Sequence, residues 1–572
     1  MSDTKLAVAQ WIQSFVPEMS VDQLAGLIEY PPNPELGDLS LPCFKLSKIM
    51  RKSPQQIAET LQTQAVGHPL VKHTIAINGY FNLFLNRAGV AAKLVQEILN
   101  APLRFASSTE GTGKKVVIDY SSPNIAKPFH VGHLRSTMIG NALRNIHEHL
   151  GYEVIGINHL GDWGTQFGKL IVAYHTYGTS VPVDEVSIQT LLDWYVKFHD
   201  DAKENPALED EARSWFTKLE NGDEAATKLW QWFKQVSMDE FERMYKKLDV
   251  TFDSYNGESF YNDQLPGVVA SLRDKGLLRH DEGAVLVDLE AFNMPPCLIL
   301  KKDGSSLYAT RDLAAAIYRA QTYAFEKCIY VTGSPQILHF QQWFKVIEMM
   351  GFDWHNKLLH VPFGQVSLGG EKFSTRKGNV VLLEDLISQT IAKTKEIMAG
   401  RALPNADELA EQVGIGAVVF GDLSHNRMKD IVFSWEDMLN FEGETGPYVQ
   451  YSYVRTCSIL RKAELLEGMS AEWIAMISSE HEAWEEGPAF ALIQELVRFP
   501  ERVQQAADKL EPSIITRHLI DIAQAFNHFY HTSQILVDDE VVRIIRLSIV
   551  AAVKNTLALG LRMIGVAAPE RM

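Results

Sequence analysis

Residues 115–137, KVVIDYSSPNIAKPFHVGHLRST, are the stretch that decides the fold. The first six form a short apolar run of the kind that becomes a buried strand of a parallel sheet. A turn with two prolines follows, and residues 133–150 then carry a helical pattern that ends at Gly151. Residues 154–158 predict a second strand. Strand, helix and strand at this spacing predict a βαβ unit of a doubly wound, Rossmann-type parallel sheet.

The rest of the chain divides around this unit. With 572 residues, several domains are expected. The N-terminal region predicts a small α+β domain with a strand-like run over residues 75–85, and strand–helix alternation returns near residue 284. After about residue 437 the strand signals fade, and the remaining residues predict an all-α bundle. The expected divisions are residues 1–110, residues 111–437 with inserted helices at 186–249, and residues 438–572.

Composition restricts the class of protein. The formal net charge of −17 disfavours a general RNA-coating protein, although a local basic surface would still allow one RNA to bind. The sequence shows no secretory signal, and the apolar stretch 541–566 carries four basic residues, which favours a packed helix over a membrane span.

The four cysteines form no C-x-x-C pair, so reduced thiols in a cytoplasmic protein are expected. They are Cys43, Cys297, Cys328 and Cys457.

The first chemical signal is the pair His130 and His133, separated by Val131 and Gly132. The pair lies between a predicted strand and its helix, where an open α/β sheet binds ligands. Imidazoles at a helix start could donate hydrogen bonds to phosphate oxygens, and Gly132 leaves room for a base against the backbone. By itself the pair could also be two unrelated histidines in a surface loop. A zinc site is disfavoured because no third ligand stands nearby.

The second signal is EKFSTRKGN at residues 371–379, preceded by Gly369 and Gly370. A glycine-flanked loop with three basic side chains could close on a polyphosphate and stabilise the charge of departing pyrophosphate. Alone, this segment could equally be a solvated basic loop.

Together the two signals resemble a known family. HVGH is similar to the "HIGH" signature of class I aminoacyl-tRNA synthetases, and KFSTR is similar to their "KMSKS" loop. Further strings resemble arginyl-tRNA synthetases in particular, across essentially the whole chain. They are residues 121–137 (SSPNIAKPFHVGHLRST), 158–168 (NHLGDWGTQFG), 306–312 (SLYATRD), 441–451 (FEGETGPYVQY) and 37–44 (GDLSLPCF).

The resemblance implies an arginine–tRNA ligase with ATP, L-arginine and tRNA(Arg) as partners. ATP would enter with Mg²⁺, and neither a tightly bound cofactor nor zinc is expected. The family is commonly monomeric, so a monomer is expected. Catalysis would rest on positioning and electrostatics, so the lack of a nucleophilic triad is no objection.

The resemblance also implies roles at the nucleotide. His130, Gly132 and His133 match the residues that hold ATP, and so do Lys372 and Ser374 of the second loop. The position that is lysine in most class I enzymes is Thr375 here. Its missing charge could come from Lys127, just upstream of His130, or from Lys377. We expect Lys127 to supply it.

The guanidinium of arginine offers fixed donors that carboxylates match in pairs, so the substrate site needs acids. Asp119 and Asp312 stand where the family places its arginine-binding acids. The resemblance implies further substrate contacts from Asn124, Tyr308 and Gln336. Glu258, in YNGES, is an additional candidate acid.

The C-terminal bundle resembles the anticodon-binding domain of these synthetases. Aromatic rings could stack on unpaired bases and a guanidinium could meet phosphate, although core packing is an equal alternative for each tyrosine. The residues expected to contact tRNA are Tyr448, Tyr451, Tyr453, Arg455 and Tyr530 in the bundle, and Tyr80 and Asn82 in the N-terminal domain.

Two other functions stay open on the sequence alone. One is a class I synthetase for cysteine or lysine, disfavoured by the paired acids and the absence of zinc-ligand cysteines. The other is a synthetase-like tRNA-binding protein without catalysis, disfavoured because both signature loops are intact.

Overall fold

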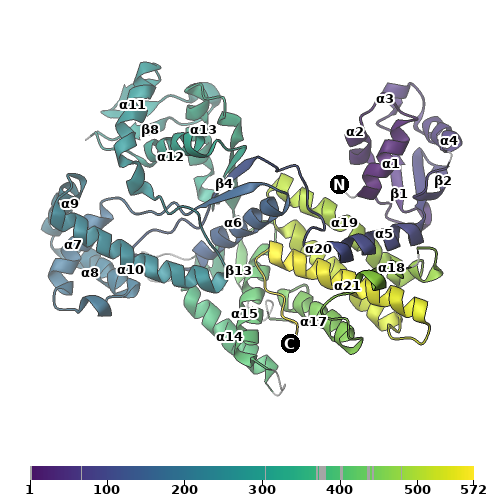
Figure 1. Cartoon of the computed structure of the whole chain (residues 1–572). Coiled ribbons are helices and arrows are strands. Elements are labelled where there is room, and N and C mark those ends of the chain that lie inside the picture. The colour runs from purple at the N-terminus through teal and green to yellow at the C-terminus, as the bar shows by residue number, and fades with distance from the viewer. Residues whose placement is uncertain are drawn as a thin grey trace.

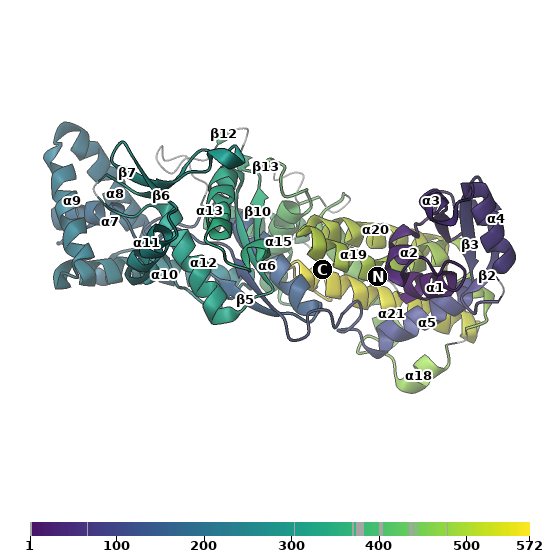
Figure 2. The ribbon, with the colours of Figure 1, turned by 90° about the horizontal axis from the view of Figure 1, so that it is seen from above.

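The chain forms three parts arranged along an elongated molecule. Figure 1 shows a central sheet, a helical bundle beside it, and a small N-terminal domain packed on the bundle. From above, a group of inserted helices lies at one end of the molecule and the N-terminal domain at the other (Figure 2). The computed structural model describes residues 3–65, 67–302, 304–368, 371–372, 382–399, 404–433, 439–440, 443–477 and 479–572.

The central sheet is parallel, with strand order β10-β9-β4-β5. Val116 and Ile118 of β4 pack in the core shared with α6, whereas Val117 faces a second core with α12 and α13. Both faces are therefore covered, as the apolar run in the sequence predicts. The Rossmann-type prediction is confirmed. The elements are β4 (Lys115–Asp119), α6 (Val131–His149), β5 (Glu153–Ile157), α12 (Tyr308–Tyr323), β9 (Lys327–Gly333), α13 (Ile337–Met349) and β10 (Leu358–Phe363).

Helix α6 connects the sheet to the bundle. It lies so close to β4 that a Cβ on Gly140 would come within 2.2 Å of the Tyr120 ring. On its outer side α6 contacts α15 (Ala406–Leu423), α19 (Gly487–Lys509) and α21 (Glu540–Met563). The helix that begins at the histidine pair is thus held from both sides.

The predicted insertion is helical. It comprises α8 (Ile188–Glu204), α9 (Ala207–Glu220) and α10 (Glu224–Leu248), which pack with α7 (Gln166–Ala173). Asp223 caps α10 by accepting a hydrogen bond from the Ala226 N–H. Figure 1 shows α10 running from the far end of this group back toward α6.

The strand expected near residue 284 does not join the central sheet. It is β7 (Ala284–Val287) of a separate antiparallel sheet with β6 (Leu278–Asp281) and β8 (Cys297–Leu300), preceded by α11 (Leu265–Asp274). Short strands close in sequence pair with each other through tight turns, here at Glu282 and Gly283, both with positive φ.

The N-terminal domain has an antiparallel sheet of order β1-β3-β2, covered by helices. The single run expected over residues 75–85 is two strands, because Asn78 and Gly79 both take positive φ and form a two-residue hairpin turn. Ser53 and Gln56 form a capping box at the start of α4. The elements are α1 (Asp3–Gln13), α2 (Val21–Leu27), β1 (Leu39–Pro42), α3 (Ser47–Met50), α4 (Pro54–Gln64), β2 (Val71–Ile77), β3 (Tyr80–Leu85) and α5 (Arg87–Asn100).

After β10 the chain forms a small sheet of order β12-β11-β13 and enters the bundle. Helix α21 is long and apolar enough to cross a membrane by length and composition, but 78% of that window is buried inside the protein. The four cysteines are buried and free. The remaining elements are β11 (Val366–Leu368), β12 (Glu371–Lys372), α14 (Leu383–Met398), β13 (Ile431–Phe433), α17 (Gly446–Lys462), α18 (Ala471–Ala475) and α20 (Ser513–Thr532).

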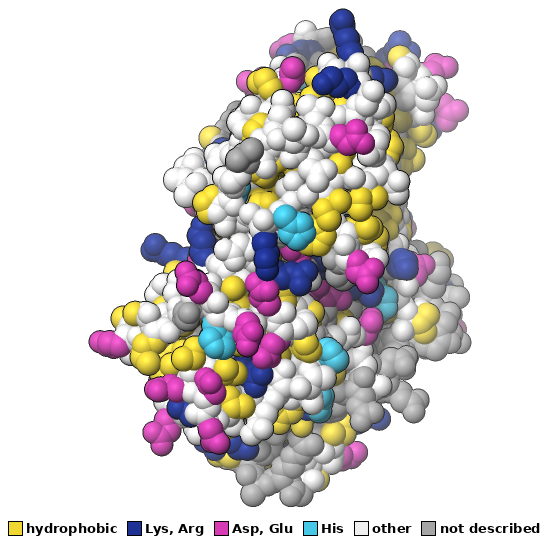
Figure 3. All heavy atoms as spheres, turned by 90° about the vertical axis from the view of Figure 1, so that its right-hand side faces the viewer, with side chains coloured by type: hydrophobic (Ala, Val, Ile, Leu, Met, Phe, Trp, Pro, Cys, Tyr) yellow, Lys and Arg dark blue, Asp and Glu magenta, His cyan; other side chains and the backbone are white. Residues whose placement is uncertain are grey.

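The face seen from the N-terminal side carries charge of both signs. Figure 3 shows Lys and Arg side chains interspersed with Asp and Glu side chains over this face. The net charge of −17 is therefore compatible with local basic positions on this surface.

Candidate active site

A cavity of about 590 Å³ opens at the carboxyl ends of β4 and β9. Open parallel sheets bind their ligands at this edge. All six residues expected to contact arginine line the cavity, together with two expected to hold ATP. The six are Asp119, Asn124, Glu258, Tyr308, Asp312 and Gln336, and the two are Gly132 and His133.

The histidine pair forms the start of α6. His130 is the N-cap residue, and its Nδ1 accepts a hydrogen bond from the Gly132 N–H at 3.1 Å. The Nδ1 of His133 accepts from the His130 N–H at 3.2 Å, and the two rings stack with centroids 3.7 Å apart. A Cβ on Gly132 would come within 2.9 Å of the His130 ring, so only glycine preserves this arrangement.

Both imidazoles are neutral at physiological pH. Burial, followed by the charge of Lys127, lowers the pKa of His130 to about 4. Burial, His130 and Lys127 lower the pKa of His133 well below its ordinary value. Because each Nδ1 accepts a backbone N–H, each proton stands on Nε2. The helix start therefore offers two neutral N–H donors beside the positive end of the α6 dipole.

The loop before α6 is strained and held from two sides. Ser121, Ser122 and Ala126 all have positive φ, which non-glycine residues adopt rarely. From α6, the Ser136 hydroxyl accepts the Ser121 N–H at 3.0 Å. This hydrogen bond ties the start of the loop to α6.

Helix α10 of the insertion supplies the other support. Its Tyr245 hydroxyl lies 2.8 Å from the Ser121 hydroxyl and accepts from the Asn158 amide at 2.9 Å. Its Ser237 hydroxyl accepts the Ala126 N–H at 2.8 Å. Helix α10 of the insertion therefore holds the loop before α6, a contact that the sequence did not indicate.

The three acids of the cavity have different partners. Asp119 forms a buried ion pair with Arg319 at 2.8 Å and accepts from the Ser122 hydroxyl at 2.8 Å. Asp312 accepts from the His339 Nε2 at 2.5 Å, and this contact raises the pKa of His339 although burial opposes it. Asp119 is thus already neutralised by a cation of the protein itself.

Glu258 stands in the 3₁₀ helix Glu258–Gln264 on the insertion side of the cavity. Burial, with smaller contributions from Asp312 and Asp162, raises the pKa of Glu258 to about 8, although the charge of Arg311 opposes this. A cation bound beside this carboxyl group would lower its pKa and favour its ionised form.

Sequence reasoning missed Asp162, which holds Ser259, the neighbour of Glu258 in the chain. The buried carboxylate of Asp162 pairs with Lys234 of α10 at 2.6 Å and accepts from the Ser259 N–H and hydroxyl at 2.8 Å each. The only available signal was its place in the string NHLGDWGTQFG. Arg319 was also missed, although it lies two helical turns after Asp312 and therefore on the same face of α12.

The remaining cavity contacts are open to solvent. Tyr308 is 68% exposed at the start of α12, and Asn124 and Gln336 are also exposed. Gly161 allows Asn124 its position, since a Cβ there would lie 2.0 Å from the Asn124 Oδ1.

The second signature loop is described only at its first residue. The backbone of Lys372 pairs with Ser367 in the small sheet. Ser374, Thr375 and Lys377 lie outside the described residues. Lys127 is half-buried, and its charge acts on both histidines, although it is not among the residues that line the cavity.

In the bundle, three of the residues expected to contact tRNA form one cluster. The Arg455 guanidinium lies 5.2 Å from the Tyr451 ring centroid and 4.9 Å from that of Tyr530. Both rings are more than one-third exposed. Tyr448 is half-buried, and its hydroxyl accepts from the Asn527 amide.

Two of the expected tRNA contacts are buried instead. Tyr453 is 5% exposed inside the bundle, so its ring has no free face for a base. Asn82 is 3% exposed and accepts from the Ser40 hydroxyl within the N-terminal sheet. Tyr80 is half-buried and packs edge-on against the exposed ring of Phe44.

Family models match almost the whole chain. Residues 3–85 match the arginyl-tRNA synthetase N-terminal domain, residues 94–435 the catalytic domain of class I tRNA synthetases (R), and residues 449–572 the DALR anticodon-binding domain. The order of the three matches is the order of the three parts of the fold.

Curated relatives match along their full length. The chain is 50% identical to arginine–tRNA ligases of Alkaliphilus metalliredigens and Clostridioides difficile, with 100% of each chain covered. The fold matches an arginyl-tRNA synthetase structure from Thermus thermophilus with a TM-score of 0.81, at 24% identity and 99% coverage of both chains. One from Plasmodium falciparum gives 0.82 at 26% identity, covering 100% of this chain and 98% of that one. The chain therefore belongs to the arginyl-tRNA synthetase family of class I aminoacyl-tRNA synthetases.

Proposed function

We propose that this chain is an arginine–tRNA ligase that joins L-arginine to tRNA(Arg) in two steps. The arginine carboxylate attacks the α-phosphorus of ATP, and pyrophosphate leaves. The terminal ribose hydroxyl of the tRNA then attacks the arginyl carbonyl, AMP leaves, and the hydroxyl proton is released. The observation that carries this proposal is one cavity that three acids, Asp119, Glu258 and Asp312, line together with His133 from the start of α6.

At the amino-acid end, Asp312 and Glu258 bind the guanidinium. One oxygen of Asp119 accepts from the Ser122 hydroxyl and the other forms an ion pair with Arg319, so we give Asp119 a secondary contact with the substrate. Asn124 suits the α-amino or carboxylate end, and Tyr308 and Gln336 approach from the exposed rim. Two carboxylates around one planar guanidinium would satisfy its donors in pairs.

At the nucleotide end, the Nε2–H groups of His130 and His133 donate to phosphate oxygens of ATP, which enters as its magnesium complex. Gly132 leaves room for the nucleotide against the backbone. Lys372 and Ser374 contribute from the second loop. Neutral donors in place before the reaction stabilise developing negative charge without having to reorganise.

Lys127 supplies the positive charge that Thr375 does not. Its effect on the pKa values of both histidines places its charge near the start of α6. Lys127→Ala is expected to slow adenylate formation about 100-fold, much more than Lys377→Ala. If Lys377→Ala lost as much pyrophosphate-exchange activity as Lys127→Ala, or more, this assignment would be contradicted.

The tRNA meets both outer parts of the molecule. We assign base stacking to Tyr451 and Tyr530 and phosphate contact to Arg455, with Tyr448 beside them. Tyr80 would contact tRNA from the N-terminal domain, whereas the buried Tyr453 and Asn82 are not included. The proposed enzyme is a cytoplasmic monomer. Its three domains comprise residues 1–110, 111–437 and 438–572.

Arginine-dependent exchange of pyrophosphate into ATP, measured with and without tRNA(Arg), tests the function. Exchange with arginine is expected, and lysine or cysteine should not replace it. Exchange with lysine or cysteine alone would indicate another synthetase. Arginine and tRNA binding without any exchange would indicate a non-catalytic tRNA-binding protein.

A further inference from the structure

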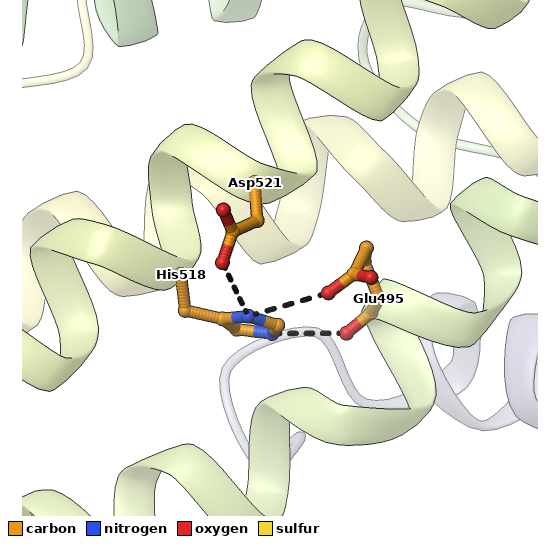
Figure 4. A group of neighbouring side chains, drawn as sticks. All are labelled: Glu495, His518 and Asp521. Atoms are coloured by element: carbon orange, nitrogen blue, oxygen red, sulfur yellow. Dashed lines mark hydrogen bonds and ion pairs between the residues drawn. The ribbon is translucent and has the colours of Figure 1, made fainter. Parts of the chain in front are cut away.

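A second cluster of ionisable side chains lies in the bundle, away from the cavity. Figure 4 shows Glu495 on α19 and His518 and Asp521 on α20 pointing toward one another. One ligand atom from each residue lies within 4.8 Å of the other two. No other group of three His, Cys, Asp or Glu side chains lies this close together among the described residues.

The imidazole of His518 is oriented as a metal ligand usually is. Its Nε2 lies 2.9 Å from the Glu495 backbone oxygen, which can only accept, so Nε2 carries the proton. The lone pair of the neutral ring therefore stands on Nδ1. Metal-binding histidines generally hold their other ring nitrogen in this manner, which fixes both tautomer and ring orientation.

The Nδ1 of His518 is buried and has no hydrogen-bond partner among the described residues. The side chain is only 2% exposed, and Nδ1 faces Glu495 Oε2 at 3.6 Å and Asp521 Oδ2 at 3.8 Å. These separations are too long for hydrogen bonds. A buried lone pair that faces two carboxylates is costly unless a cation lies between them.

The distances fit a small ion with tetrahedral coordination. Ligand atoms about 2.1 Å from a tetrahedral Zn²⁺ stand about 3.4 Å from one another. The observed 3.6 and 3.8 Å need only small side-chain adjustments to reach this value. The second oxygen of Glu495 is held by Arg498 at 2.6 Å, which leaves Oε2 for the ion.

We propose that Glu495, His518 and Asp521 form a binding site for a divalent transition-metal ion such as Zn²⁺. One nitrogen and two carboxylate oxygens favour such an ion over Mg²⁺, which prefers oxygen alone. The Asp521 side chain is 44% exposed, so water can take the fourth position and the ion has a path of entry. This departs from the sequence-based expectation of no metal site, because the ligands come from two helices and show no motif spacing.

The ion would join α19 to α20 within the bundle. Arg498, next to the site, also lies 4.5 Å from the ring centroid of Tyr30 in the N-terminal domain. A metal ion here would therefore stiffen the junction between the bundle and that domain. Its role is structural, and it takes no part in the aminoacylation chemistry.

The test is a calorimetric titration of the full-length, chelator-treated protein with Zn²⁺. His518→Gln keeps a donor for the Glu495 oxygen but removes the Nδ1 ligand, and the half-exposed Asp521→Asn removes one oxygen ligand. The wild type is expected to bind one more ion than either variant at micromolar Zn²⁺. Saturating Zn²⁺ should also raise the melting temperature of the wild type by about 2–6 °C and leave both variants unchanged.

Two controls separate this site from other metal-binding side chains. Asp508→Asn, also on α19 but away from His518, should keep the wild-type stoichiometry. Replacement of His528 and His531 by glutamine should do the same. Co²⁺ should give the visible absorption of tetrahedral coordination in the wild type and lose it in His518→Gln. The proposal is overturned if both ligand variants keep the wild-type stoichiometry, or if the wild type takes up no ion at micromolar Zn²⁺.

Discussion

The acid end of the cavity, with Glu258 and Asp312, and the histidine end, at the start of α6, are proposed to bind groups of opposite charge. At both ends burial favours the neutral form of an ionisable side chain. The acid end must receive a cation, and the raised pKa of Glu258, about 8, keeps that group largely protonated at neutral pH. In the proposed function the histidine end receives an anion, and the lowered pKa of His130, about 4, keeps that ring neutral. Glu258 and His130 thus both stay in their neutral forms near pH 7, and Glu258 favours its ionised form only when a cation binds beside it.

The largest effect is expected from a substitution that alters only the acid end of the cavity. Asp312→Ala removes a carboxylate that faces the guanidinium, so the KM for arginine should rise about 100-fold or more. The KM for ATP should change less than about twofold, since the proposed function assigns Asp312 to the guanidinium and not to the nucleotide. Steady-state pyrophosphate exchange with each substrate varied in turn measures both values. An equal rise in both KM values would contradict the division into two ends.

The matching change breaks the histidine end alone. In His133→Asn the side-chain oxygen can still accept the His130 N–H, but the Nε2–H donor is lost. The kcat of adenylate formation should fall about 30–100-fold while the KM for arginine stays within about twofold. Thermal unfolding serves as the control and should be nearly unchanged. A variant whose main defect is arginine binding would show that the histidines do not act on the nucleotide.

The pH dependence should differ between the two ends. Bound guanidinium favours the ionised form of Glu258, so below pH 8 arginine binding must expel a proton, and above pH 8 it need not. The KM for arginine should therefore fall as pH rises, by up to about tenfold per unit below pH 8, and then level off. In Glu258→Gln this slope should disappear. The KM for ATP should show no step from His130 above about pH 5, because the pKa of His130 is about 4.

The smallest expected effect concerns the loop that joins the two ends. Tyr245→Phe removes the hydroxyl that contacts Ser121 and Asn158 without removing the packed ring. The kcat should fall about 5–10-fold and stability by about 1 kcal/mol. Denaturant unfolding and single-turnover adenylate formation measure the two. Tyr255→Phe is the control, because Tyr255 takes no part in these contacts. Equal losses of kcat and stability in both variants would contradict a specific role of the Tyr245 hydroxyl in holding the loop.

The sequence predicts the parts of this account that depend on local pattern. The apolar run 115–120, the turn and the following helix place His130 and His133 at the carboxyl edge of a parallel sheet, and the structure confirms that fold. The position of Asp119 follows from the same rule, because it ends β4, whereas Asp312 lies near the start of α12 and is expected only from the family resemblance. The dipeptide Asn78–Gly79 is itself a hairpin signal, so the division of residues 75–85 into two strands is also predictable from local pattern.

What the sequence could not predict depends on contacts between distant segments. Tyr245 reaches Ser121 across 124 positions, and Lys234 reaches Asp162 across 72. No periodicity within α10 indicates which of its polar side chains turn inward to the catalytic loop. For the same reason the ligand set on α19 and α20 shows no spacing motif. Burial of Tyr453 and Asn82 likewise depends on how whole elements pack.

The most direct test of the two-ended cavity compares arginine with citrulline, which has nearly the same shape but carries no charge. Calorimetric titration of the full-length protein should show citrulline binding at least about 100-fold more weakly than arginine, because two carboxylates would then face an uncharged group. Asp312→Asn should weaken arginine binding strongly and citrulline binding little, so that the two affinities converge. Citrulline binding as tight as arginine, or unchanged discrimination in Asp312→Asn, would contradict the claim that these acids select the substrate by its charge.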